Sequence, residues 1–398
     1  MLRGKDRQRG AAWLAGLAVT AILAVAGCSS GSSQAPAGSQ GAGSQGAGPS
    51  AMSSSEAAAM ENPNLDLGAS LDNEPAPDFT LTNQFGQPMS LSQFRGKVVM
   101  LSFDDPKCTD ICPLTTQSMV LAKELLGKAG TSVQLLGVSA NPEDANKVSD
   151  VMAYTRAHGL VNQWDFLTGP DAQLKKVWTD YKIAVQIANG DIDHTPALYL
   201  IDQQGKQVKA YLTQMAYSSV TQSAEVLAQE VSSLLPSHPK LSSLESLATV
   251  SLQGPTATVS LPAASAGGST APSVTLGPGK ARLVVFFATW LSEVSDLKAE
   301  LTTLNTYAKD AAAKHLPALT AVDETVTEPS KQAVTSFLGT LGKLDYPVAL
   351  DETGRVADGY GAQNQPWLVL VDKSGKVVWQ HDDWVSLPEL EKAAAAVH

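Results

Sequence analysis

Cysteine is nearly absent from this chain, because its 398 residues contain only Cys28, Cys108 and Cys112. Three thiols, two of them four residues apart, cannot supply a structural disulfide framework. Positive charge is also scarce: 28 Lys and Arg stand against 39 Asp and Glu, and the formal net charge is −11. A chain this acidic lacks the attraction for phosphates that nucleic-acid-binding proteins need, which argues against nucleic acid as a partner.

The N-terminal apolar run, residues 11–26, is too short for a comfortable transmembrane helix. Four Lys or Arg residues precede it and Val-Ala-Gly-Cys28 follows it, which is the layout of a signal peptide at residues 1–27. This ending resembles the lipobox of bacterial lipoproteins. The resemblance implies lipidation of Cys28 and an extracytoplasmic protein anchored by lipid to the bacterial cell membrane, with an uncleaved signal anchor as the alternative.

Residues 28–75 begin with that cysteine and continue with Gly, Ser, Ala, Gln and Pro. Such a composition offers too little apolar surface to offset chain entropy, so we expect a disordered tether. A flexible coil of about 45 residues spans roughly 35 to 40 Å. The tether would hold the folded part near the membrane without fixing its orientation.

The rest of the chain exceeds the usual size of one domain and contains an internal repeat. PALYLIDQQGKQV at 196–208 aligns without gaps on PWLVLVDKSGKVV at 366–378. Each copy predicts a strand, an Asp-x-x-Gly turn and a return strand. An apolar strand followed by a helix lies upstream of each copy, in 97–103 and 282–290. The same module therefore occurs twice.

Strands that alternate with helices and end in an antiparallel hairpin predict an α/β fold with a mixed sheet flanked by helices. This arrangement is similar to the thioredoxin fold, so we expect two thioredoxin-like domains in tandem, at residues 76–236 and 240–398. Pro196 and Pro366 stand at the place of that fold's cis-proline. A proline that begins a central strand is otherwise awkward, because it lacks a ladder donor.

Cys108 and Cys112 follow the strand at 97–103, where a thioredoxin fold carries its active thiols at a helix N-terminus. The helix dipole there favours thiolate, so we expect a lowered thiol pKa. On one helical turn their Cβ atoms would be about 5 to 6 Å apart, which is wider than the roughly 3.5 to 4.5 Å of a disulfide. The spacing favours a shared soft metal ion, and Cu(I) is the obvious one outside the cytoplasm.

His194 is the candidate third ligand, because it lies two residues before Pro196 in a loop that should face the thiols. A third soft or borderline ligand completes a trigonal copper site, whereas zinc would need a fourth. The alternative is a surface histidine. Asp110 is a candidate partner of the ligands or an ordinary acid at a helix N-terminus.

Residues 76–235 resemble the SCO/SenC family, thioredoxin-like copper-binding proteins implicated in assembling the copper A centre of cytochrome c oxidase. The matching motifs are Phe103, Cys108-Thr-Asp-Ile-Cys112-Pro113, Asp193-His194-Thr195 and Tyr199-Leu200-Ile201-Asp202. The resemblance implies that Cys108, Cys112 and His194 bind copper, as Cu(I), Cu(II) or both. It also implies a copper-bearing oxidase subunit, or another copper protein, as the partner.

Three positions depart from the family pattern without removing a ligand. Thr109 stands where Pro is frequent, Lys107 replaces an aromatic or histidine neighbour, and Pro196 after Thr195 is more typical of thioredoxins. These departures keep redox chemistry open as an alternative to metal delivery.

Residues 240–398 resemble a TlpA/ResA-type thioredoxin domain in the stretch FFATW, which ends at Trp290. Leu291 and Val294 stand at the thiol positions of that group, and this half contains no cysteine, so it cannot perform thiol-disulfide exchange. Trp290, Pro366 and Trp367 remain around an apolar groove. This groove predicts a partner-binding or dimerisation surface, or a duplicated domain kept for packing.

Three functions follow from these patterns. The first is a membrane-tethered copper chaperone for oxidase assembly. The second is an enzyme, a thiol-disulfide oxidoreductase in which Cys108 attacks, Cys112 resolves and the oxidised form holds a disulfide between them. The third is a non-catalytic interaction protein that depends on the second domain. Loss of His194 should separate the first two, since only metal binding needs it as a ligand.

Overall fold

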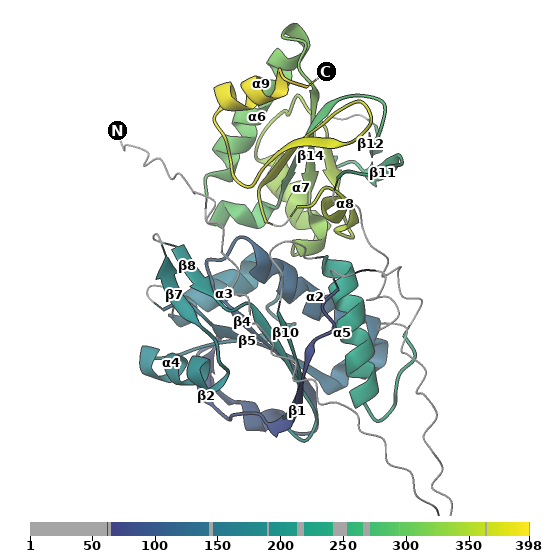
Figure 1. Ribbon diagram of the computed structural model, residues 1–398. Helices are drawn as coiled ribbons and strands as arrows, with labels where there is room; N and C mark the ends of the chain where they lie inside the picture. The colour runs from purple at the N-terminus through teal and green to yellow at the C-terminus, as the bar shows by residue number, and fades with distance from the viewer. Residues whose placement is uncertain are drawn as a thin grey trace, which may run out of the picture. The chain divides into compact units, whose positions relative to one another are not determined.

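The computed structural model contains two α/β domains, each with a mixed β-sheet between helices (Figure 1). It confirms the predicted fold class. All described residues belong to one compact unit, and none of their helices is long and apolar enough to cross a membrane. Cys28, the predicted signal peptide and most of the predicted tether lie outside the described residues. The structure describes residue 62 and residues 65–142, 146–188, 191–212, 219–241, 253–265, 271–293, 295–362 and 364–397.

The first domain is built on an eight-stranded sheet in the order β1-β10-β9-β4-β5-β6-β2-β3. β4, β5 and β6 run parallel, while β9 is antiparallel to β4 and β10 to β9. Every residue of the central strand β4 is buried, because helices cover both faces. The strands are β1 Ala69–Pro75, β2 Thr80–Asn83, β3 Pro88–Ser90, β4 Val98–Asp104, β5 Val133–Ser139, β6 Asp165–Thr168, β9 Ala197–Ile201 and β10 Lys206–Leu212.

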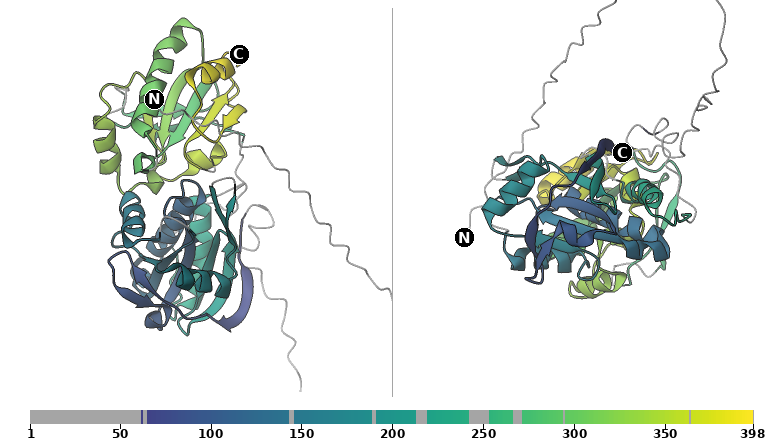
Figure 2. Two further views of the ribbon diagram at one scale, coloured as in Figure 1. Left: turned by 90° about the vertical axis from the view of Figure 1, so that its left-hand side faces the viewer. Right: turned by 90° about the horizontal axis from the view of Figure 1, so that it is seen from below.

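Alternate side chains of β4 enter two separate cores. Val98 and Met100 pack with residues of α2, α3 and α5, whereas Val99 and Leu101 pack with residues of α4. Figure 1 shows α2 and α5 side by side, and Figure 2 gives two further views of the sheet and its helices. The helices are α2 Ile111–Leu125, α3 Val148–Ala157, α4 Asp171–Asp180 and α5 Val220–Leu234.

The boundary of the first domain differs from the sequence prediction, which ended the tether at residue 75. Residues Ala69–Pro75 form β1 and pair with β10, with Ala69 opposite Ala210 and Pro75 opposite Lys206. Most of β1 is exposed and Leu71 packs only partly against the core, so main-chain hydrogen bonds to a sheet edge hold most of this strand. Composition therefore gave no sign of this strand.

The second domain has a five-stranded sheet in the order β15-β14-β13-β16-β17. This is the same order and the same set of directions as β6-β5-β4-β9-β10 in the first domain, as the internal repeat predicted. A two-stranded sheet, β11 with β12, is added to it. The strands are β11 Val259–Pro262, β12 Ser273–Leu276, β13 Arg282–Phe287, β14 Ala318–Asp323, β15 Val348–Leu350, β16 Trp367–Val371 and β17 Val377–His381.

Helices and the small sheet cover this second sheet from its two sides. One core joins it to α6, α7 and α9, and the other joins it to α8, β11 and β12. The helices are α6 Leu297–Ala313, α7 Lys331–Gly339, α8 Arg355–Gly359 and α9 Leu387–Ala394.

The repeated hairpins are formed as predicted. In the first, the Gly205 N–H donates to the Asp202 carbonyl at 2.9 Å, and in the second, Gly375 donates to Asp372 at 3.0 Å. Both glycines have positive φ, 78° and 87°, a conformation that costs glycine little because it has no Cβ. The Asp-x-x-Gly pattern therefore specifies both turns by the same local chemistry.

Candidate metal centre

The thiol loop joins the end of β4 to the start of α2. The Cys108 N–H donates to the Asp105 carbonyl at 3.0 Å, and the Asp110 side chain accepts from the Ile111 N–H at 2.8 Å as the helix N-cap. Because α2 begins at Ile111, Cys112 lies in its first turn but Cys108 lies before it. The two cysteines therefore do not share one helical turn, contrary to the geometry that the sequence suggested.

His194 reaches the thiols from a hairpin that the sequence did not predict. β7 (Val185–Ala188) pairs with β8 (Asp191–His194), and His194 ends the second strand. Its Nε2 lies 3.7 Å from the Cys112 Sγ. On the other side of the ring, Nδ1 lies 3.2 Å from the Thr195 carbonyl oxygen. That carbonyl accepts the Nδ1 proton and so orients Nε2 toward the sulfur.

Cys108 also lies near this pair, close enough to Cys112 for a hydrogen bond between their side chains. Its Sγ donates to the Asp110 carboxylate at 2.8 Å. Cys112 is only 2% exposed, whereas Cys108 is partly buried, and both are free thiols. Among the described residues, no three His, Cys, Asp or Glu side chains are gathered closely enough to hold a metal ion. The structure thus brings Cys112 and His194 together and places Cys108 close to Cys112, with its Sγ hydrogen-bonded to Asp110.

The pKa of Cys108 differs in direction from the sequence expectation. Burial, the hydrogen bond and charge of Cys112, and the neighbouring Asp110 raise this pKa well above its usual range. The expectation relied on the helix dipole, but Cys108 stands outside the helix and next to an acid. At neutral pH this sulfur is a thiol rather than a thiolate.

The pKa of His194 is raised, whereas burial lowers the pKa of an ordinary buried histidine. Burial lowers its pKa, but the hydrogen bond and charge of Cys112, the Thr195 carbonyl and Asp104 raise it to about 9. A metal ion that binds Nε2 must therefore displace a proton.

Sequence reasoning missed two buried side chains near the thiols. Asp104 ends β4, is 1% exposed and accepts from Ser102 Oγ at 2.5 Å. Burial raises its pKa to about 6, although Ser102 and His194 act to lower it. Tyr154 of α3 shares a contact of 3.3 Å with Thr116 of α2. Asp104 could have been singled out from the sequence, because it is an acid at the end of a central strand, directly before the thiol loop.

The two prolines at the expected cis positions, Pro196 and Pro366, differ in the isomer of the preceding peptide bond. Of the peptide bonds that the structure describes, only Gln365–Pro366 is cis, so the prediction is right for Pro366 and wrong for Pro196. The Ala197 N–H donates to the Thr195 carbonyl at 2.9 Å across Pro196. This tight turn lets the strand begin at Ala197 with a trans peptide before the proline.

In the second domain, a 3₁₀ helix (Thr289–Glu293) takes the place of the thiol loop. Leu291 is 2% exposed and belongs to the core, and Trp290 and Trp367 are each 5% exposed. Val294 lies outside the described residues. The groove expected around these tryptophans is therefore not an open surface.

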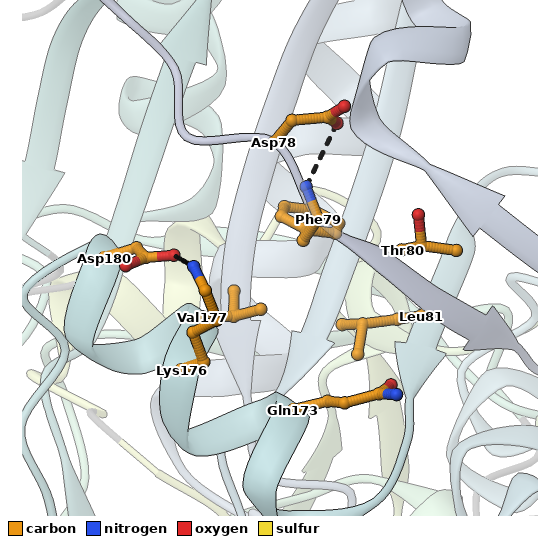
Figure 3. A pocket seen from close by; sticks show the side chains of 8 residues that line it. All are labelled: Asp78, Phe79, Thr80, Leu81, Gln173, Lys176, Val177 and Asp180. Atoms are coloured by element: carbon orange, nitrogen blue, oxygen red, sulfur yellow. Dashed lines mark hydrogen bonds and ion pairs between the residues drawn. The ribbon is translucent and has the colours of Figure 1, made fainter.

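A separate cavity of about 350 Å³ lies in the first domain between β2 and α4 (Figure 3). Its lining includes Phe79, Leu81 and Val177, and the ion pair of Lys176 with Asp180 at 2.5 Å. None of the candidate metal ligands lines this cavity, and it contains no thiol or imidazole.

The family comparison matches one model, SCO1/SenC, over residues 69–231. The "SCO1 protein homolog" of Bacillus subtilis (strain 168) is 28% identical over 138 residues, which is 33% of this chain and 71% of that protein. The "SCO2-like protein" of Rickettsia felis is 27% identical over 141 residues, or 34% of this chain and 67% of that protein.

Solved structures are also similar. The apo Sco1 protein of Thermus thermophilus has a TM-score of 0.36 and 26% identity, covering 43% of this chain and 98% of its own. ScoI of Bradyrhizobium japonicum with copper bound has a TM-score of 0.35 and 23% identity, covering 40% and 99%. The family match begins at Ala69, the first residue of β1, and ends within α5. Over residues 69–231, this chain is therefore similar to the SCO1/SenC family.

Proposed function

We propose that this protein binds one copper ion with Cys108, Cys112 and His194 and passes it to a copper-bearing subunit of cytochrome c oxidase. The observation that carries the proposal is the 3.7 Å contact of Cys112 Sγ with His194 Nε2 inside a domain similar to the SCO1/SenC family. Two thiolates and one imidazole are a donor set that soft Cu(I) prefers. Copper is here the cargo of the protein rather than a resident cofactor.

Loading requires a small movement of one side chain. Cys108 must leave the Asp110 carboxylate, to which its Sγ donates at 2.8 Å, and turn toward Cys112 and His194. Each binding sulfur, and Nε2 of His194, gives up its proton, so affinity rises with pH. Nδ1 of His194 keeps its proton and donates it to the Thr195 carbonyl, 3.2 Å from Nδ1, which preserves the ring orientation throughout.

Release follows the same steps in reverse. Cys108 is the more exposed thiol and stands outside the helix. A thiolate of the acceptor would therefore replace Cys108 as a copper ligand first. Asp110 then receives the Cys108 thiol again. Cys112 and His194, which are more confined, are exchanged afterwards.

The finer parts of the proposal concern place and partner. The lipobox at Cys28 would attach the protein to the outer face of the bacterial membrane, near a membrane-bound oxidase. The tether would give the domains the reach to meet an acceptor there. The copper A centre is the acceptor that the family resemblance implies.

The test is a Cu(I) titration of the reduced, oxygen-free protein against a competing chelator. We expect one tightly bound copper, a loss of about 10- to 100-fold in affinity or more in His194→Ala, and no tight site in the Cys108→Ser/Cys112→Ser variant. His381→Ala is the matched control, because His381 lies in β17 of the second domain. Weak binding that His194→Ala leaves unchanged would overturn the proposal.

A thiol-disulfide oxidoreductase is the second candidate, and one observation favours it. Cys108 and Cys112 are close enough for a hydrogen bond between their side chains. The raised pKa of Cys108 works against it, since exchange needs an attacking thiolate. A reduction potential for this pair in the range of known exchange proteins, together with activity that survives His194→Ala, would favour this candidate.

A further inference from the structure

The cysteine-less site of the second domain touches the thiol loop of the first. The N–H of Gln365, the residue before the cis proline, donates to the Thr109 carbonyl at 3.4 Å. Thr109 lies between the two thiols. A main-chain donor at the start of a strand is a common means of holding an extended segment. In this protein, the second domain uses such a donor to hold the thiol loop of its own chain.

Side-chain contacts surround that hydrogen bond. Val326 of the second domain packs on Leu114 of α2 and Val220 of α5. Ser219, at the N-terminus of α5, donates from Oγ to Asp358 Oδ2 at 2.6 Å, and this pair is buried. The contact therefore joins apolar burial to a satisfied buried hydrogen bond, as stable interfaces do.

Trp290, which the sequence placed at an apolar groove, packs on the first domain. Its ring centroid lies 4.8 Å from that of His158, at the end of α3. Its Nε1 donates to Thr327 Oγ1 at 3.1 Å, which fixes the indole. A Cβ on Gly159 would meet the Cα of Pro329 at 2.5 Å, so the two backbones approach closely here. The aromatic left beside the lost thiol site thus packs on the thiol-bearing domain.

This contact restricts access to Cys108. A cavity of about 170 Å³ is lined by Cys108 and Lys107 and also by Trp290 and Glu293 of the second domain. Drug-sized ligands occupy pockets of about 300 Å³ or more, so this space admits a small molecule but not the loop of a protein partner. Cys112 is almost fully buried.

We propose that the second domain binds, through its cysteine-less site, the thiol loop of its own chain, and that a protein partner reaches Cys108 only when the two domains separate. This inference deepens the proposed function, because it describes control of access to the same thiols. The contact itself involves no metal. It can therefore be tested without copper.

The test uses the full chain, reduced and free of metal, and follows alkylation of Cys108 by peptide mass spectrometry. One reagent is iodoacetamide, which is small, and the other is a maleimide with a long polyethylene glycol chain. Val326→Arg should separate the domains, and Val378→Arg is the matched control on exposed β17 of the same domain. Because burial of one valine corresponds to about a tenfold change in an equilibrium, we expect Val326→Arg to speed labelling by the long maleimide about tenfold.

Iodoacetamide labelling should change much less, and Val378→Arg should match the unaltered protein with both reagents. Ser219→Gly is a second variant, since it removes the bond to Asp358, while glycine remains an acceptable N-cap for α5. Ser219→Gly should also increase the rate at which the long maleimide labels Cys108. Unchanged labelling by the long maleimide in both variants, with native circular dichroism, overturns the inference. If the unaltered protein showed no tight copper binding in the Cu(I) titration, the proposed function would be overturned, but a labelling difference in these variants would still support the contact between the domains.

Discussion

At the scale of single residues, the environment of Cys108 decides how the thiol loop behaves. Its sulfur donates to Asp110 at 2.8 Å, and the same carboxylate caps α2 through the Ile111 N–H at 2.8 Å. Asp110 is therefore both a hydrogen-bond partner of Cys108 and the N-cap of α2, which the sequence left as alternatives. The acid accepts the Cys108 thiol proton and, together with burial and Cys112, helps to raise the pKa of that thiol.

Asp110→Asn separates these two roles. Asparagine still caps a helix, but it carries no negative charge, so the pKa of Cys108, which Asp110 helps to raise, should fall. The pH profile of iodoacetamide labelling at Cys108 should move to lower pH. Asp150→Asn is the control, because Asp150 lines the same cavity but is not among the groups that shift this pKa. An unmoved profile in Asp110→Asn would show that Asp110 does not contribute to the raised pKa of Cys108.

At the scale of elements, β5 has no room for a side chain at Gly137. A Cβ on Gly137 of β5 would lie 2.5 Å from the Trp164 ring and 3.0 Å from the Phe166 ring. Both aromatics are buried in the core that joins the sheet to α2, α3 and α5. The glycine is thus required by the packing of neighbouring side chains and not by its own backbone angles.

Gly137→Ala should lower the free energy of unfolding by about 1 to 3 kcal/mol, because the added methyl overpacks this core. The control is Gly339→Ala at the end of α7, where no atom lies within 4 Å of the new Cβ. Alanine is the better helix former there, so that change should be neutral or stabilising by up to about 1 kcal/mol. Urea unfolding of both variants measures the difference, and equal midpoints would contradict the packing argument.

At the scale of the whole molecule, buried acids of the second domain make stability depend on pH. Burial raises the pKa of Asp358 to about 8, and Asp351 adds to this, while Ser219 and Arg355 act to lower it. Glu324 is another buried acid whose pKa is raised by burial and by Asp351 and Asp358. A carboxyl that keeps its proton in the folded state but not in the unfolded state stabilises the fold only at low pH.

For Asp358 this stabilisation is fully present below its unfolded pKa of 3.8 and is lost as the pH rises through about 8. Between pH 5 and pH 9 the loss is up to about 4 kcal/mol. Asp358→Asn cannot ionise, so its free energy of unfolding should fall less over that interval. Urea unfolding at the two pH values tests this, and an identical decline in both proteins would contradict it.

The sequence alone predicted the two α/β modules, their hairpins and the three candidate ligands, because alternating apolar strands, Asp-x-x-Gly turns and the Cys-x-x-x-Cys motif are local patterns. It did not predict β1 (Ala69–Pro75), which is mostly exposed and is held mainly by main-chain pairing. It also missed the trans peptide before Pro196, the hairpin that carries His194 and the raised pKa of Cys108. Those features depend on which groups meet in space, and only the tertiary structure determines the burial, the charges and the hydrogen-bond partners around each atom.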